Sequence, residues 1–206
     1  MDRLNVLKDF AFQKVFGAEG DELQLLGFLN ATLEHTGKGN LLSVKILENK
    51  DLPAEITGHK GAKLDVLASV SGASTSGSDS LADVEVQIRN QYNIEKRSLC
   101  YWNRRYIWNF TSGSDYIDLV PVIAVNIVDY GLFPIEDFHP SFHLREDRHS
   151  EFILSDTCEI HFLDMVKWRK LKNSRFGGFL QEIRQIYETC VGLKSATTNR
   201  VVEQVQ

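Results

Sequence analysis

The spacing of apolar residues divides the chain into helical and extended segments. Residues 4–16 and 21–35 are predicted helices, and in the second the apolar side chains recur three and four positions apart. Residues 41–48 alternate apolar and polar positions, which predicts a first strand. The longest predicted helix covers residues 91–110, which contain neither glycine nor proline.

Two runs with period two follow the first strand, at residues 63–70 and 81–88. On a strand, alternate side chains share a face, so Asp65 stands opposite its apolar neighbours in the first run. The glycine- and serine-rich segment 71–80 is expected to be a flexible turn between the two strands. In the second run one face carries Asp83, Glu85, Gln87 and Arg89, and the core face carries Ala82, Val84, Val86 and Ile88.

Residues 119–128 form a nearly continuous apolar run. Such a run is typical of a strand that is buried on both faces and lies parallel to a neighbour across a helical crossover. The order strand, strand, helix, strand therefore predicts an α/β domain. The remaining predictions are a loop at 49–62, short strands at 142–144 and 158–163, and helices at 164–172 and 177–192.

Composition predicts one soluble domain over residues 1–206, since 206 residues of which 43% are hydrophobic can bury one core. No apolar run is long enough to cross a bilayer, and the first residues lack a signal-peptide segment. The three cysteines, Cys100, Cys158 and Cys190, are far apart, so we expect reduced, mostly buried thiols and a cytoplasmic protein.

The two period-two runs hold the candidate chemistry. If they pair as a hairpin, Asp65 and Glu85 lie side by side. Adjacent carboxylates repel each other unless a cation lies between them, and hard oxygen ligands suit Mg²⁺ or Mn²⁺. The alternative is a solvated polar strand face, which is common in proteins.

Further motifs occur in a fixed order around this pair. They are Asp9 to Phe16, Leu25 to Leu33, Arg97 with Tyr101, Gly113-x-x-Tyr116 and Leu119 to Val125. Together with Asp65 and Glu85-x-Gln87 twenty residues later, this set resembles the Rpn/YhgA-like branch of the PD-(D/E)xK nucleases, often labelled recombination-promoting nucleases or transposases. The resemblance covers roughly residues 4–165 and leaves a C-terminal helical segment at about 164–206, expected to be partly flexible.

The resemblance implies an α/β restriction-endonuclease-like core, with a central mixed sheet flanked by helices. It assigns Asp65 and Glu85 to the metal, together with the backbone carbonyl of Val86, and Asp9 to the same site through water. Gln87 occupies the place where the superfamily usually has lysine. An amide can orient a water molecule but supplies no charge, which predicts a weaker or more Mn²⁺-dependent enzyme. For Asp9 the alternative is an ordinary carboxylate in the first turn of a helix.

Basic residues near the proposed site are the candidates for DNA contact. The net charge of −5 argues mildly against nucleic-acid binding, so local positive charge has to provide it. Arg97, Tyr101, Arg104 and Arg105 have helical spacings that predict one basic and aromatic stripe. Solvated charge is the alternative for Arg104 and Arg105, and also for Lys63, which could instead supply the missing positive charge.

Two other groups carry weaker signals. The segment 167–175 has five basic and no acidic residues, and fits a nucleic-acid contact or an ordinary charged surface. The six histidines show no metal-binding pattern, and Pro140 favours a loop at His139 and His143.

The function that these features imply is a Mg²⁺- or Mn²⁺-dependent DNA endonuclease that hydrolyses phosphodiesters, linked to recombination or mobile elements. Three-carboxylate transposases are built on another fold, so a transposition reaction is not expected. DNA is the expected partner, without a membrane or an organic cofactor, and the oligomeric state stays open. The alternative is a degenerate nuclease fold that binds DNA or a protein without cutting.

Overall fold

The computed structural model describes residues 16, 20, 22–34, 36–37, 40–47, 66–72, 80–87, 89–90, 92–108 and 110–171. These residues form helices and strands, with two runs of consecutive strands separated by a helix. The elements are α2 (Glu22–Glu34), β1 (Leu41–Leu47), β2 (Val66–Gly72), β3 (Ser80–Gln87), α3 (Ile94–Tyr106), the 3₁₀ turn η2 (Tyr116–Asp118), β4 (Val122–Val128), β5 (Ser141–His143), β6 (Cys158–Asp164) and α4 (Met165–Leu171).

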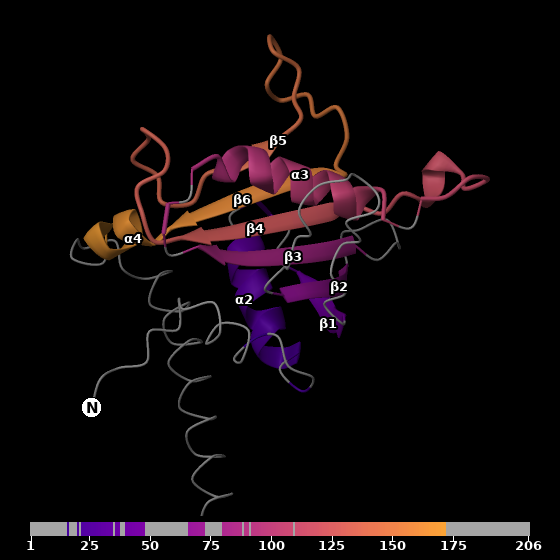
Figure 1. Ribbon diagram of the computed structural model, residues 1–206, viewed down its shortest axis with the longest axis horizontal. Helices are drawn as coiled ribbons and strands as arrows, with labels where there is room; N and C mark the ends of the chain where they lie inside the picture. Colours follow the sequence, from indigo (N-terminus) through magenta and orange to yellow (C-terminus); the bar gives the residue numbers. More distant parts are fainter. Residues whose placement is uncertain are drawn as a thin grey trace, which may run out of the picture.

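The described strands form one mixed six-stranded sheet in the order β1-β2-β3-β4-β6-β5 (Figure 1). β1, β2 and β3 pair in antiparallel fashion, whereas β3, β4 and β6 are parallel to one another. Parallel neighbours need a crossover connection, and α3 supplies it between β3 and β4. The short strand β5 is antiparallel to β6 at the edge of the sheet. The mixed sheet with flanking helices confirms the predicted fold class.

Helices cover both faces of the sheet, with α2 on one side and α3 on the other (Figure 1). On the α2 side, Leu25, Leu29 and Leu33 pack into an apolar cluster with the inward side chains of β3 and β4. On the α3 side, Ile94 and Phe162 belong to a second apolar cluster. The central strands therefore lie in a layer that water does not reach on either face. Every residue of β4 is buried, as the apolar run at 119–128 predicted.

Most predicted elements in the described residues are confirmed within about three positions. The largest difference is the helix predicted over residues 91–110, which begins only at Ile94 and ends at Tyr106. Tyr92 and Asn93 both have a positive φ, near 60°, so neither can belong to a right-handed helix. The chain thus turns sharply between β3 and α3.

Several predictions fall outside the described residues. These are the first helix apart from Phe16, the loop at 49–62, the turn at 73–79, the helix at 177–192, Cys190, and the site residues Asp9, Lys63 and Asp65. Within the described residues, Cys158 is buried as expected, but Cys100 is exposed on α3, so the prediction of buried thiols is wrong there. None of the described helices has the length and apolar character that crossing a bilayer requires.

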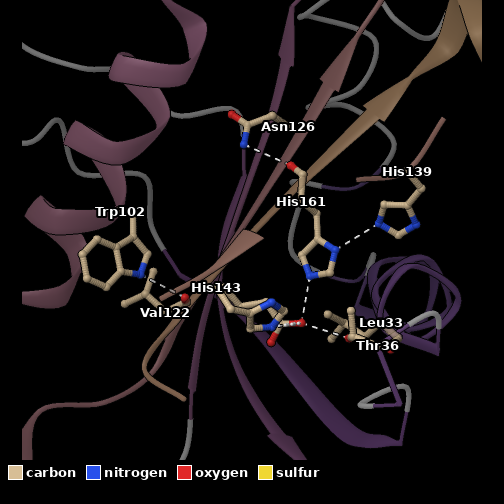
Figure 2. A network of polar contacts seen from close by, with 9 residues as sticks. Leu33, Thr36, Trp102, Val122, Asn126, His139, His143 and His161 are labelled. Carbon is tan, nitrogen blue, oxygen red and sulfur yellow. Dashed lines mark hydrogen bonds and ion pairs between the residues drawn. The ribbon is translucent and has the colours of Figure 1, made fainter. Parts of the chain in front are cut away.

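A buried polar network lies beside the α2 face of β6 (Figure 2). His161 Nδ1 is 3.0 Å from His139 Nε2, and His161 Nε2 is 3.0 Å from Glu159 Oε1. Thr36, just beyond α2, donates to the same carboxylate oxygen at 2.9 Å. His143 Nε2 is 3.6 Å away from it. The network ties the end of α2 and the edge strand to β6.

The hydrogen bonds fix the tautomers of the network. An ionised Glu159 can only accept, so His161 donates through Nε2, and its Nδ1 then accepts from His139 Nε2–H. Sequence spacing did not predict this arrangement. His143 is the last residue of β5, which agrees with the short strand predicted at 142–144 and contradicts the loop that Pro140 suggested there. His139 does precede the strand.

We expect Glu159→Ala to lower the free energy of unfolding by about 1–3 kcal/mol, because the buried donor of His161 loses its acceptor. Thr36 is partly exposed and keeps the backbone oxygen of Leu33 as an acceptor. Glu159→Gln keeps an acceptor oxygen and should lose less, and the exposed Glu151→Ala serves as the control. Urea denaturation of the three variants measures this. Equal stability of Glu159→Ala and Glu151→Ala would show that the network does not stabilise the fold.

Candidate active site

Three polar side chains of β3 point toward α3, namely Asp83, Glu85 and Gln87. Their apolar neighbours Val84 and Val86 point into the cluster on the α2 side, as the period of two predicted. The three polar residues are only 2%, 7% and 6% exposed. A solvated strand face is therefore excluded for them. Buried carboxylates need partners of opposite charge, and α3 provides these.

The register of the sheet places Glu85 beside Asn126 of β4. Asn126 Nδ2 donates to Ser98 Oγ of α3 at 2.8 Å and to the backbone oxygen of His161 at 3.2 Å. These buried hydrogen bonds hold α3 against the parallel strands next to Glu85. The buried hydrogen bonds of the core, rather than the attraction between charged side chains, therefore set the distance between α3 and the Glu85 carboxylate.

Arg97 is the direct partner of Glu85. Its Nη2 lies 3.2 Å from Glu85 Oε2, and the guanidinium also stacks over the Tyr101 ring at 5.6 Å. Burial raises the pKa of the Tyr101 hydroxyl, and the nearby Glu85 carboxylate raises it further. Arg97 and Tyr101 therefore line the same side of α3, as their spacing of four predicted, and this side faces the acidic residues.

Arg105 differs from the predicted DNA-binding stripe. It is 3% exposed, so it is not available on a surface that a phosphate could reach, and the prediction of an exposed stripe is wrong at this position. Burial lowers the pKa of the Arg105 guanidinium, while Asp83 and Glu85 oppose that shift. Arg105 follows Arg97 by eight positions, about two helical turns, and so returns to nearly the same face of α3, which here packs on the sheet. Arg104 is half-buried.

In the part of the chain that the structure describes, the side-chain amide of Gln87 makes a hydrogen bond through its nitrogen but not through its oxygen. Its Nε2 donates to the backbone oxygen of Arg89 at 3.1 Å. A flipped amide would place two oxygens against each other, so this contact fixes the orientation of the group. Its Oε1 is buried and has no hydrogen-bond partner among the described residues. Gln87 thus offers an acceptor oxygen on the same face as Glu85.

The structure brings together only part of the predicted metal site. β2 and β3 pair as the predicted antiparallel hairpin, with Val66 opposite Val84 at the end of the described ladder. Val86 lies on β3 between Glu85 and Gln87. In the described part of the chain, no three or more His, Cys, Asp or Glu side chains form a group that could hold a metal ion. Asp65 lies just outside that part.

Two residues of the second basic cluster, at 167–175, form ion pairs with carboxylates of the protein. Lys167 Nζ is 3.3 Å from Asp164 Oδ2, and Arg169 Nη1 is 2.6 Å from Asp129 Oδ1. Each cation therefore has an internal carboxylate that a phosphate would have to replace.

Two residues of this region were not predicted to belong to the site. The period of two placed Asp83 on the same face as Glu85, but its burial and its interaction with Arg105 are seen only in the structure. The hydroxyl of Tyr130, two residues after β4, is buried without a hydrogen-bond partner among the described residues. No sequence pattern marks Tyr130, because only the packing of β4 against α3 brings it to this end of the sheet.

One comparison with known proteins gave a match. The family described as PD-(D/E)XK nuclease family transposase matches residues 6–181, which include all the described strands and α3. A search of curated proteins found no match, and neither did a search of solved structures.

The electrostatic interaction between Arg105 and the buried Asp83 carboxylate can be tested by measuring the stability of the fold. We expect Arg105→Met, which keeps an unbranched side chain without charge, to destabilise the fold by on the order of 3 kcal/mol, because buried carboxylates lose an attractive charge. Adding Asp83→Asn should restore part of the loss. The exposed Lys96→Met on the same helix is the control, and thermal denaturation is the readout. Full additivity of the Arg105 and Asp83 changes would contradict the coupling.

Proposed function

Since this chain belongs to the PD-(D/E)XK nuclease family transposases, we propose that it is a divalent-metal-dependent DNA endonuclease that acts in recombination or in the movement of genetic elements. The observation that carries the proposal is the pairing of a buried Glu85 with a buried, vacant Gln87 oxygen on one face of β3. A strand that served only the core would gain nothing from these groups, since burying a charge costs free energy even when it is paired, and the Gln87 oxygen has no partner among the described residues.

The residues present fit Mg²⁺ or Mn²⁺. Both ions prefer oxygen ligands, and Glu85 offers a buried carboxylate on β3. The register between β2 and β3 supports Asp65 as the second carboxylate. The last described pair is Val66 with Val84. Continued by one position, this register would pair Asp65 with Glu85. The Val86 carbonyl remains the proposed backbone ligand.

The roles of the residues follow from their chemistry. A bound divalent ion would polarise the scissile phosphate and lower the pKa of a coordinated water. Gln87 Oε1 accepts a hydrogen bond from the attacking water and so orients its lone pair. Arg97 lies within reach of Glu85 and remains more exposed than the carboxylate, so it can turn toward a phosphate oxygen when a cation takes over the charge of Glu85. The attacking water loses one proton to solvent and its oxygen bonds to phosphorus. The bond from phosphorus to the leaving oxygen breaks, and that oxygen takes up one proton from solvent.

A second candidate is supported by one specific contact. Arg97 already neutralises Glu85, so the buried carboxylate is compensated without any metal. A degenerate member of the family that binds DNA or a protein without cutting would keep this ion pair as a structural element. Cleavage assays separate the two possibilities.

The purified protein should nick supercoiled plasmid only with Mg²⁺ or Mn²⁺. Glu85→Gln and Asp65→Asn should each reduce the rate at least about 100-fold, because each removes a charged ligand that stabilises the transition state. Glu95→Gln, an exposed carboxylate on α3, is the matched control and should cut normally. Unchanged cleavage by the Glu85 and Asp65 variants, with contaminating nuclease excluded, would refute the proposed chemistry.

DNA binding should depend on Arg97 and Arg104 rather than on the buried Arg105. We expect Arg97→Ala and Arg104→Ala each to weaken binding to unrelated sequences and to lower the salt slope by about 0.9 per lost phosphate contact. Fluorescence anisotropy in EDTA at several salt concentrations measures this, with the exposed Lys45→Ala on β1 as the control. If Lys167→Ala or Arg169→Ala weakens binding instead, the DNA binds to the basic cluster at 167–175 rather than to α3.

A further inference from the structure

Two vacant polar atoms lie at the same end of the sheet, on the side that faces α3. They are Gln87 Oε1, an acceptor, and the Tyr130 hydroxyl, which can donate. Both are buried, and neither has a hydrogen-bond partner among the described residues. Most buried polar groups in folded proteins are hydrogen-bonded to protein or to ordered water. Two vacant groups of opposite type in one region therefore indicate a bound molecule between them.

The fold explains how Tyr130 reaches Gln87. Val128, the last residue of β4, pairs with Gln87, and the next amide, Asp129 N, donates to the Gln87 backbone oxygen at 3.1 Å. Tyr130 then packs against the apolar cluster of Ile94 and Val128 on the α3 side. Its ring thus lies on the face of the sheet that carries Gln87.

The atom of the Gln87 amide that has no partner in the described part of the chain is an acceptor. One Nε2–H donates to the backbone oxygen of Arg89, which directs the nitrogen end toward Arg89 and leaves Oε1 as the end that can meet the attacking oxygen. An acceptor can orient a water molecule, but a water that is losing its proton becomes negative and needs a hydrogen-bond donor as well. A lysine in the place of Gln87 would supply such a donor, so the donor in this chain has to come from another residue.

The protonation state of Tyr130 suits this task. Burial raises the pKa of the Tyr130 hydroxyl above its ordinary value, with Arg97 acting in the opposite direction. The phenol therefore keeps its proton at neutral pH and remains a donor.

We propose that Tyr130 is a positioning residue of this site, and that its hydroxyl and Gln87 Oε1 hold one water molecule between them, the nucleophile of the proposed hydrolysis. The inference rests on the proposed function. The water donates one hydrogen to Gln87 and accepts one from Tyr130, which gives it two of the polar partners that a buried water usually has. The Tyr130 hydrogen bond strengthens as negative charge grows on the water oxygen.

The water itself can be tested by crystallography, independently of activity. A high-resolution crystal structure of the metal-free protein should contain an ordered water about 2.7–3.0 Å from both Tyr130 Oη and Gln87 Oε1. The water should be lost in Tyr130→Phe, which retains the ring and the packing. A direct hydrogen bond between the two side chains, or a Tyr130 hydroxyl bonded to another group, would overturn the proposal.

The catalytic role is tested by a double-mutant cycle between Tyr130→Phe and Gln87→Lys. In the wild-type background, Tyr130→Phe should lower kcat about 10- to 100-fold without changing the affinity for DNA, because one donor to a developing charge is lost. In the Gln87→Lys background the lysine supplies a donor, so the same change should lower kcat less than threefold. The exposed Tyr116→Phe is the control, and thermal denaturation checks that the variants are folded.

The outcomes separate the two claims. Equal losses in both backgrounds, or a higher KM with unchanged kcat, would overturn the positioning role, since the hydroxyl would then be structural or would bind a phosphate oxygen. Absence of any metal-dependent cleavage by the wild-type protein would refute the proposed function together with the catalytic part of this inference. In that case the crystallographic water would still decide whether Tyr130 and Gln87 share a ligand.

Discussion

The charge compensation between β3 and α3 determines how the candidate site is built. β3 is a central strand with helices on both faces, so Asp83 and Glu85 cannot be stabilised by solvent. Arg97 meets Glu85 at 3.2 Å, and Arg105 interacts with Asp83 and Glu85 from within the core. A buried ion pair of this kind contributes less to stability than an apolar pair would, but removing one partner alone is costly. The four charged side chains therefore form one interdependent unit.

This constraint has a functional consequence. Fold stability alone would favour apolar residues at these buried positions. A functional role explains why the strand carries carboxylates there, with arginine partners that can be displaced. In the account proposed above, a divalent cation and Arg97 compete for the charge of Glu85. The apolar clusters, together with the Asn126–Ser98 hydrogen bond, keep α3 in place, so such an exchange requires only a movement of the Arg97 side chain.

The sequence predicted those features that depend on local periodicity. The hairpin of β2 and β3, the buried strand β4 and the division of β3 into two faces all follow from the spacing of apolar residues. The family followed from the order of several motifs, and the match over residues 6–181 confirms it. The apolar periodicity is a local property and the order of the motifs follows the chain, so both can be recognised from the sequence alone.

Features that depend on the packing of one layer against another could not be predicted. Helical spacing placed Arg105 on the same stripe as Arg97, but it could not tell whether that stripe faces solvent or the sheet. His139 and His161 lie 22 positions apart, and the sequence gives no sign that they are in contact. The pairing of β5 with β6 brings them together. Tyr130 is similar, since its position depends on the register between β3 and β4.

The competition between Arg97 and a cation for Glu85 is tested most directly by calorimetric titration of Mn²⁺ into the wild-type protein, Arg97→Met and Glu85→Gln. The account predicts that Arg97→Met binds Mn²⁺ roughly tenfold more tightly than the wild type, because the carboxylate is freed from a charged hydrogen bond. Glu85→Gln should bind far more weakly. Unchanged or weaker binding by Arg97→Met, together with wild-type affinity in Glu85→Gln, would contradict it.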